Sequence, residues 1–425
     1  MVRVADSRGK FLGTALYSSS SQIAIRMIGG NNAEITDLPA FVSERIRAAI
    51  AYRKQAVSGS DAYRVVFSEA DFLPGLIIDR YNDVVSVQIL TQAMDTGPIR
   101  GAIIATLVEE LHPAGIVERV DPRIRELEQL PVRESGMMWG RKSASIITMN
   151  VESSAAEAAD EGAASTVALK RCAAQKQALT TTGEGASEGA PQGLKPSSKT
   201  RTIGTAEAVP FPDFAKTASG VRFYYDALEG QKTGAFLDQR ENYAAATRYA
   251  RGDALDIFCY QGGFALHLAA ECASVTGVDT SRPALELAEK NAALNFPGRE
   301  FEWIEANAFD LLRDYAAAGR RYDAIVLDPP AFARTKRDLP KALSGYKELN
   351  LRALKMLAPG GILVTCSCSF HVGAADFLEI VAGAARDAHK FLRLLESRGA
   401  AKDHPLLINV PETGYLKCLV FHVSN

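Results

Sequence analysis

Two cysteines late in the sequence stand where a nucleophile could act. Leu357–Thr365 has the pattern of a turn followed by a strand, and Cys366 and Cys368 come directly after it. Ligands bind at the carboxyl edge of an α/β sheet, and a thiolate can add covalently to an electron-poor carbon. Burial in the core is the commoner fate of a Cys. Two of them in a Ser-rich strand end favour a chemical role, and no partner ligands stand at the spacing of a metal site.

An acidic, proline-rich turn follows an earlier predicted strand. Tyr322–Leu327 is strand-like and leads into the segment Asp328–Phe332, DPPAF. Two consecutive prolines fix a rigid turn, which would lie at the same carboxyl edge of the sheet. A purely structural turn does not require an acid, two prolines and an aromatic residue together. The composition therefore favours a functional turn.

A βαβ unit over residues 255–279 would position both features. Its first strand is predicted at Ala254–Phe258, its helix at Phe264–Ala273, and its second strand at Ser274–Val278, with Asp279 at the end. The glycines between the first strand and the helix allow backbone to approach a ligand, and a terminal acid can hold two ribose hydroxyls. A ligand-free βαβ unit is the alternative, but this spacing favours nucleoside binding.

The sequence of the turn indicates which kind of nucleoside would bind. Dinucleotide sites use G-x-G-x-x-G, whose helix N-terminus receives a pyrophosphate. Here Tyr260 and Gln261 precede adjacent Gly262 and Gly263, and the third glycine is missing. This arrangement suits a ligand without phosphate, such as S-adenosylmethionine.

A methyl donor beside a thiol suggests a particular reaction. Carbon 5 of a pyrimidine is a poor nucleophile, but addition of a thiolate to carbon 6 makes it an enamine that accepts a methyl group. Loss of the proton at carbon 5 and expulsion of the Cys then restore the ring. Covalent catalysis of this kind divides one hard step into easier ones, and an electropositive site would help to ionise the thiol.

The elements after Asp279 continue the α/β pattern. Helices are predicted at Pro283–Asn295 and Asp310–Ala318, with a strand at Phe301–Glu305. Asn307 follows that strand at the position where such folds usually read adenine. The segment 332–355 carries seven Lys and Arg residues, which suit a solvated helix face or a phosphate backbone equally well.

The chain before this region divides into smaller parts. Residues 1–58 read as strands at Val2–Val4 and Gln22–Ile28 and a helix at Phe41–Tyr52, which together suggest a small β-rich module. Residues 59–226 read as an α+β domain. The predicted elements of that domain are strands at Tyr63–Ser68, Leu76–Asp79, Val84–Leu90, Gly115–Arg119 and Gly220–Asp226 and a helix at Ile99–Leu111.

A segment of low complexity interrupts this middle domain. Residues from about 141 to 207 are rich in Ala, Gly, Ser and Thr, and we expect a disordered insertion because such a composition buries little apolar surface. The polar run Gly230–Arg240 precedes the βαβ unit and suggests a lid over the cofactor, before a helix at Glu241–Arg251. From this run Gln239 and Arg240, and beyond the acidic turn Phe332 and Lys336, are the candidate substrate-binding residues.

Composition limits the remaining possibilities. The chain has 425 residues, a net charge of -2 and six scattered Cys without a Cys-x-x-Cys pair. We expect a cytoplasmic protein of two or three domains without a zinc site, a signal peptide or a membrane span. RNA contacts would come from local patches. Oligomeric state is left open, a homodimer included.

Taken together, the motifs resemble those of the class I methyltransferases that form 5-methylcytosine in 23S ribosomal RNA and carry an N-terminal PUA domain. The resemblance rests on these segments: EADFLPGLIIDRY, GQKTGAFLDQRENY, DIFCYQGGFALHLA, GVDTSRPALELAEKNAALN, DPPAFARTK, GYKELNLRAL, SCS and DHPLLINVPETGYLKCL.

The resemblance implies a role for each site residue. Phe258, Tyr260, Gln261, Gly262, Gly263, Asp279 and Asn307 would bind S-adenosylmethionine, Asp328 and Pro329 would contact its methionyl part and the target base, and Cys368 would be the nucleophile. The distance from the Gly-Gly turn selects Cys368 over Cys366.

The chain departs from the family pattern in three respects. It starts about halfway through the expected PUA domain, Asn307 replaces the usual Asp, and the insertion is extra. The expected fold is therefore an α/β, Rossmann-like methyltransferase domain over 227–425, after a middle α+β domain and a truncated PUA-like module.

The expected function is methylation of cytosine carbon 5 in 23S rRNA or in a ribosome assembly intermediate. Methylation of another base or RNA, a non-catalytic S-adenosylmethionine-binding assembly factor, and a nicotinamide oxidoreductase are the alternatives. The missing third glycine and Asp328–Pro330 disfavour the oxidoreductase.

Overall fold

The computed structural model describes residues 1–21, 23–29, 34–141, 145–149, 220–225, 235–333 and 335–424. At its start, a three-stranded antiparallel sheet has the order β1-β2-β3. Its strands are β1 (Val2–Ala5), β2 (Phe11–Tyr17) and β3 (Ile25–Met27). The first and third correspond to predicted strands, although β3 is shorter and Gln22 lies outside the described residues. Strand β2 was not expected from the sequence.

A five-stranded mixed sheet with the order β4-β5-β6-β7-β8 follows. Its strands are β4 (Ala62–Phe67), β5 (Leu76–Tyr81), β6 (Val84–Ile89), β7 (Gly115–Glu118) and β8 (Gly136–Gly140). The helices of this part are α1 (Leu38–Ala56), α2 (Gly97–Leu111) and α3 (Pro122–Leu127). Apolar side chains of α1, α2 and the sheet form one core, which therefore continues across the boundary expected at residue 58.

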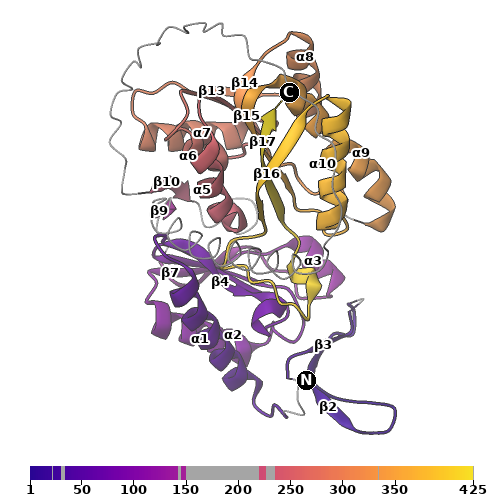
Figure 1. The fold of residues 1–425 in the computed structure, drawn as a ribbon. Coiled ribbons are helices and arrows are strands. Elements are labelled where there is room, and N and C mark those ends of the chain that lie inside the picture. The colour runs from indigo at the N-terminus through magenta and orange to yellow at the C-terminus, as the bar shows by residue number, and fades with distance from the viewer. Residues whose placement is uncertain are drawn as a thin grey trace, which may run out of the picture. The chain divides into compact units, whose positions relative to one another are not determined.

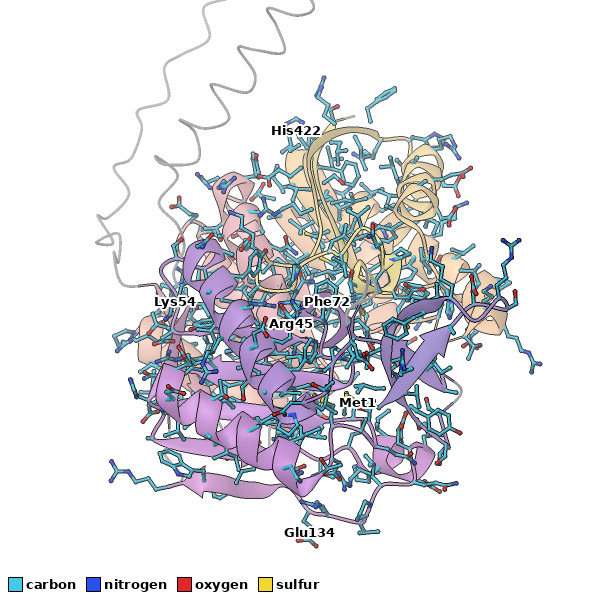
Figure 2. All side chains as sticks on the ribbon, turned by 90° about the horizontal axis from the view of Figure 1, so that it is seen from below. Met1, Arg45, Lys54, Phe72, Glu134 and His422 are labelled. Carbon is cyan, nitrogen blue, oxygen red and sulfur yellow. The ribbon has the colours of Figure 1, made fainter. Side chains whose placement is uncertain are left out.

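Aromatic residues hold a cation on the outer side of α1 (Figure 2). The guanidinium carbon of Arg45 lies 5.1 Å from the ring centroids of both Phe41 and Phe72. Two rings cover the apolar faces of this guanidinium, and its Nε is buried without a hydrogen-bond partner among the described residues. This arrangement ties α1 to the turn that follows β4.

A two-stranded ladder corrects the expected start of the insertion. Strand β9 (Ser145–Met149) pairs antiparallel with β10 (Val221–Tyr225), with Ile147 opposite Phe223. Both of these side chains are buried, and Tyr225 stacks on Tyr81 with 3.8 Å between ring centroids. The expectation of disorder from residue 141 is wrong at 145–149, because alternate apolar residues there reach a core. The expected insertion from 150 to 207 lies outside the described residues.

The second half of the chain forms a seven-stranded sheet with the order β13-β12-β11-β14-β15-β17-β16 (Figure 1). Its strands are β11 (Asp253–Ile257), β12 (Ser274–Asp279), β13 (Glu302–Glu305), β14 (Tyr322–Leu327), β15 (Leu357–Ser367), β16 (Phe391–Arg398) and β17 (Lys417–Ser424). Strand β17 alone runs antiparallel to its neighbours β15 and β16. The strand order reverses between β11 and β14, and open α/β sheets bind ligands at such a point.

Helices cover both faces of this sheet (Figure 1). Helices α5 (Arg240–Tyr249), α6 (Gly263–Leu268) and α7 (Arg282–Asn295) pack on one face, and α8 (Ala308–Ala317), α9 (Leu339–Met356) and α10 (Ala374–Asp387) pack on the other. A separate apolar core fills each side. The expected Rossmann-like fold is confirmed. Among the described residues, none of the helices combines the length and the apolar character that crossing a bilayer demands.

Candidate active site

The turn after β11 is held in an unusual backbone conformation. Phe258, Tyr260 and Gly262 have positive φ angles of 69°, 49° and 88°. The N–H groups of Phe258 and Cys259 both donate to the carbonyl of Val278, at 2.9 and 3.0 Å. Non-Gly residues adopt positive φ only at a cost, and such residues cluster at ligand sites. The turn is thereby folded back onto the end of β12, at the point where the strand order of the sheet reverses.

Gly263 is required for a different reason. A Cβ atom there would lie 2.5 Å from the hydroxyl oxygen of Tyr243, which is closer than packed atoms approach. The ring of Tyr243 lies against Phe264 and His267 of helix α6. The missing side chain therefore lets α6 start close to α5, beneath the turn.

A buried carboxyl group supports the same turn from inside the sheet. Oδ2 of Asp256 accepts a 2.8 Å hydrogen bond from the N–H of Ala265, and Oδ1 is buried without a hydrogen-bond partner among the described residues. Burial raises the pKa of Asp256 to about 8, and the charges of Asp328 and Asp279 add to this effect. Sequence reasoning missed Asp256 as a site residue, although an acid within an apolar strand was a signal for it.

Asp279 ends β12 with its carboxylate in a fixed orientation. Oδ2 accepts from the N–H of Tyr260 at 3.0 Å, and Oδ1 accepts from the N–H of Ser281 at 2.9 Å. Each carboxylate oxygen can accept a second hydrogen bond. Two neighbouring hydroxyls of a ribose could therefore be held in addition, as the sequence predicts.

Asn307 begins helix α8 and caps it. Its Oδ1 accepts from the N–H of Phe309 at 2.9 Å and from that of Asp310 at 3.4 Å. Because capping uses the oxygen, the amide NH₂ is the group that Asn307 can offer to an adenine ring. An Asp at this position could cap with one oxygen and accept from a ligand with the other.

Asp328 lies next to the turn of β11. Its N–H donates to the carbonyl of Ile257 at 3.3 Å, and its Oδ1 accepts from Nε2 of Gln239 at 2.9 Å. The Oε1 of Gln239 accepts in turn from Nδ2 of Asn242 at 2.6 Å. Gln239 and Asn242 are almost fully buried. A chain of amide groups therefore sets the orientation of this carboxylate.

The two cysteines differ in their surroundings. Cys366 is completely buried opposite Cys418 of β17, and burial raises its pKa well above the ordinary value. Cys368 is only partly buried, and its Sγ lies 3.8 Å from the carbonyl oxygen of Pro329. The expected burial of Cys366 is confirmed. The structure brings Cys368 together with Asp328-Pro329, which stand 39 residues earlier.

Residues around Cys368 form a polar cluster that sequence reasoning missed. The Oγ of Ser369 lies 2.9 Å from the hydroxyl of Tyr346 and accepts from the N–H of Ala333 at 3.2 Å. Nζ of Lys417 donates to the carbonyls of Ser369 and Tyr415, at 2.7 and 2.8 Å. The only sequence signal was a Lys among the apolar residues of the last strand.

The candidate substrate residues lie in different environments. Gln239 and Arg240 are buried, while Lys336 is exposed in the 3-10 helix η3 (Lys336–Asp338). Phe332 is half-buried, with its ring centroid 4.8 Å from that of Tyr346. Of the predicted lid, residues 230–234 lie outside the described part. Residues 237–239 form the short helix η2 (Leu237–Gln239). The present burial of Gln239 and Arg240 suits a structural role better than RNA contact.

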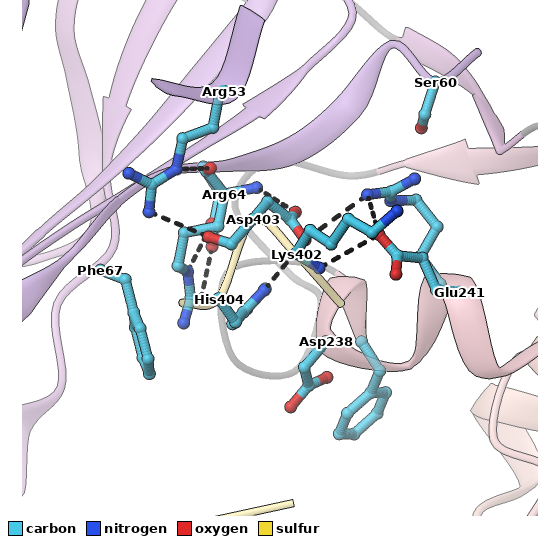
Figure 3. A network of polar contacts seen from close by, with 12 residues as sticks. Arg53, Ser60, Arg64, Phe67, Asp238, Glu241, Lys402, Asp403 and His404 are labelled. Atoms are coloured by element: carbon cyan, nitrogen blue, oxygen red, sulfur yellow. Dashed lines mark hydrogen bonds and ion pairs between the residues drawn. The ribbon is translucent and has the colours of Figure 1, made fainter. Parts of the chain in front are cut away.

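Arg240 belongs to a buried polar network centred on Asp403 (Figure 3). Its Nη2 lies 3.5 Å from Oδ1 of Asp403, whose Oδ2 accepts from the N–H of Arg64 at 2.8 Å. Nη2 of Arg53 donates to the carbonyl of Asp403 at 2.9 Å. Burial would raise the pKa of Asp403, but His404, Arg240 and the hydrogen bond from Arg64 lower it to about 2. The network joins α1 and β4 to the segment before β17.

Comparison with known proteins places these features in one family. The model of the S-adenosylmethionine-dependent methyltransferases matches residues 167–422, and that of a PUA-like domain matches residues 1–29. Proteins named ribosomal RNA large subunit methyltransferase I are similar over nearly the whole chain. The one from Photobacterium profundum is 32% identical over 100% of this chain and 90% of its own length. The one from Tolumonas auensis is 34% identical over 99% and 89%.

Solved structures agree with the fold. A candidate methyltransferase in complex with SAH superposes with a TM-score of 0.71 and 16% identity, over 99% of this chain and 90% of that one. A candidate SAM-dependent methyltransferase from Streptococcus mutans gives a TM-score of 0.70 and 16% identity, over 98% and 89%.

Proposed function

The chain belongs to the family of S-adenosylmethionine-dependent methyltransferases, and we propose that it methylates carbon 5 of cytosine in the 23S RNA of the large ribosomal subunit. The observation that carries this proposal is the position of Cys368 beside Pro329 at the carboxyl edge of the sheet, where the preceding residue, Asp328, bonds to the end of β11. A thiol is the nucleophile that addition to a pyrimidine needs. The names of the full-length relatives support the choice of RNA.

The residues present fit the family's cofactor. Asp279 offers a fixed carboxylate for a ribose, and Asn307 offers an amide for the adenine. The turn Phe258–Gly263 contains no Lys or Arg, as suits a nucleoside without phosphate. Bound there, S-adenosylmethionine supplies an electrophilic methyl group.

Cys368 and the acidic turn would act on the base. The thiolate of Cys368 adds to carbon 6, and the electron pair of the 5,6 double bond makes carbon 5 nucleophilic. After carbon 5 has taken the methyl group, it loses its proton to a base. The bond between sulfur and carbon 6 then breaks and restores both the ring and the thiolate. Asp328, fixed by Gln239, would contact the base and the methionyl part.

Several narrower features belong to the same proposal. The division into a PUA-like module at 1–58, a middle domain at 59–226 and a catalytic domain at 227–425 is one of them, with α1 of the first part sharing the core of the second. The substrate would be free 23S rRNA or a ribosome assembly intermediate in the cytoplasm. A homodimer is the proposed oligomer, and a sedimentation measurement of the full chain tests it.

A trapping experiment tests the reaction. RNA containing 5-fluorocytidine should form a covalent adduct, because fluorine blocks the loss of the proton at carbon 5. Mass spectrometry should locate the adduct on Cys368. The variant Cys368→Ala should lose turnover and keep cofactor binding, while Cys366→Ala should lose only modest stability. An adduct on Cys366, or active enzyme without an adduct, would contradict the mechanism.

A cellular experiment tests the substrate. Mapping of 5-methylcytosine in 23S rRNA from cells with and without the gene should show one site that disappears. Methylation of another base or RNA, or an unchanged map, would contradict the proposed substrate.

A further inference from the structure

Lys417 carries its ammonium group into the protein, where it contacts the residue that directly follows the candidate nucleophile. It is the first residue of β17, where it stands opposite Ser367 of β15, and only 7% of it is exposed. Two of its three N–H bonds donate to the carbonyls of Ser369 and Tyr415. Ser369 directly follows Cys368 in the chain. The ammonium is thus anchored to the backbone one residue beyond Cys368 and to the segment that precedes β17.

The surroundings do not provide this cation with a carboxylate. Among the residues that the structure describes, no acidic oxygen forms an ion pair with Lys417 at 4.0 Å or less, whereas most other buried cations, such as Arg53 and Arg64, have one. Burial lowers the pKa of Lys417 to about 8, and the charge of Cys368 acts in the opposite direction. Burying an ammonium is costly unless a negative charge is nearby. Cys368 is the group that can provide one.

We propose that Lys417 is a positioning residue that holds Cys368 as a thiolate, poised for attack on the target base. Thiolates form most readily beside a fixed cation. This inference deepens the proposed function, on which it rests for the identity of the nucleophile. Lys417 itself makes no bond to substrate and acts through the sulfur.

Other titratable groups face the same site. Burial raises the pKa of both Tyr346 and Tyr415 above the ordinary value, so these phenols are neutral around pH 7. The hydroxyl of Tyr415 donates to Oδ2 of Asp238 at 2.6 Å. The charge of Arg64 lowers the pKa of Tyr415, but burial outweighs this effect. Asp328 lies one residue before Pro329 and carries a negative charge that opposes thiolate formation. Of the groups named here, Lys417 is the one whose positive charge would favour ionisation of the sulfur.

Alkylation of the thiol measures this effect without any RNA. Iodoacetamide should be reacted with the full-length protein between pH 6 and 10, and modification of Cys368 followed by peptide mass spectrometry, with fragment ions that separate it from Cys366. We expect the wild-type rate to be half-maximal below about pH 8.5, the value of a free thiol. A midpoint at or above this value in wild-type protein would overturn the proposal without any variant.

Three variants separate charge from packing. Lys417→Met keeps the length of the side chain and removes its charge, so Cys368 should react at pH 7 about tenfold more slowly, the effect of a midpoint displaced by about one pH unit. Lys417→Arg keeps the charge and should retain most of the wild-type rate. The exposed Lys54→Met is the matched control and should leave the rate unchanged. A Lys417→Met rate within about fivefold of wild type, or equal losses in the Met and Arg variants, would overturn the proposal.

Failure of this inference and failure of the proposed function give different results. If methyl transfer to 23S rRNA fails while alkylation follows the expected pattern, the RNA assignment is wrong and the role of Lys417 stands. If methyl transfer proceeds while alkylation of Lys417→Met is unchanged, the role of Lys417 is wrong.

Discussion

The amide nitrogen of Gln239 donates a hydrogen bond of 2.9 Å to the carboxylate of Asp328, although 89 residues separate the two in the chain. Gln239→Glu would replace this donor by an acceptor and place two carboxylates together. Hydrogen bonds to charged groups contribute about 1.5–3 kcal/mol, so we expect methyl transfer to fall about 10- to 100-fold in a folded protein. The exposed Gln55→Glu serves as the control. Full activity of Gln239→Glu would show that the orientation of Asp328 is unimportant.

Asp279 provides the second prediction, which concerns cofactor binding. Asp279→Ala removes both the proposed acceptor for the ribose and the anchor of the Tyr260 N–H. Affinity for S-adenosylmethionine should fall by roughly 1–3 kcal/mol, as measured by calorimetry. Asp314→Ala, on the exposed side of α8, should bind as wild type does. An unchanged affinity in Asp279→Ala would exclude the ribose role.

The third prediction concerns acid sensitivity under the cofactor turn. Burial lowers the pKa of His267 to about 4, and its Nδ1 lies 2.7 Å from the carbonyl of Gly263. The pKa of His267 in the unfolded chain is about 6.5. Its contribution to stability is complete above this pH and is lost as the pH falls towards 4, the pKa in the folded protein. The raised pKa of Asp256 acts oppositely, because its contribution is lost as the pH rises from about 4 to 8.

These two contributions should cancel in wild-type protein between about pH 4 and 6.5. Asp256→Asn keeps an acceptor for the Ala265 N–H and removes one of the two titrations. Between pH 6.5 and 5 its unfolding free energy should therefore fall by about 2 kcal/mol relative to wild type. Urea unfolding at both pH values measures this difference. If the unfolding free energy changed equally in both proteins between the two pH values, Asp256 would not titrate as described.

The Asp403 network gives the fourth prediction (Figure 3). Asp403→Ala leaves the N–H of Arg64 and the guanidinium of Arg240 without this partner. Breaking a buried ion pair from one side costs about 3–5 kcal/mol, and we expect a loss of this size in urea unfolding. The exposed Asp310→Ala should lose little. A stability near that of wild type would show that water replaces the carboxylate.

The sequence predicted the parts of the fold that local pattern determines. Alternating apolar residues and glycines located β11, β12 and the turn at Gly262 and Gly263, because a βαβ unit is specified within about 25 residues. Strand β9 was missed because it pairs with β10 across a long separation in the chain. Pairing at such distances leaves no local signal beyond a short apolar run.

The candidate site also contains residues that the local sequence indicates and residues that only the folded structure reveals. Asp279 and Asp328 were found because each directly follows a predictable strand. Lys417 and Asp256 were missed because their positions matter only through contacts made after folding. Arg240 was expected to bind substrate, but its guanidinium forms an ion pair with Asp403. Asp403 lies more than 160 residues later, and no spacing rule could indicate such a partner.

The position of β17 has a consequence for synthesis of the protein. This strand lies between β15 and β16 but follows both in the chain. While the chain emerges from its own ribosome, Cys368 appears first and Lys417 joins it only after residues 417–424 have left the exit tunnel. Domains fold during synthesis in the order in which they emerge. The surroundings of Cys368 therefore become complete only after β17 has been inserted between two strands that were made before it.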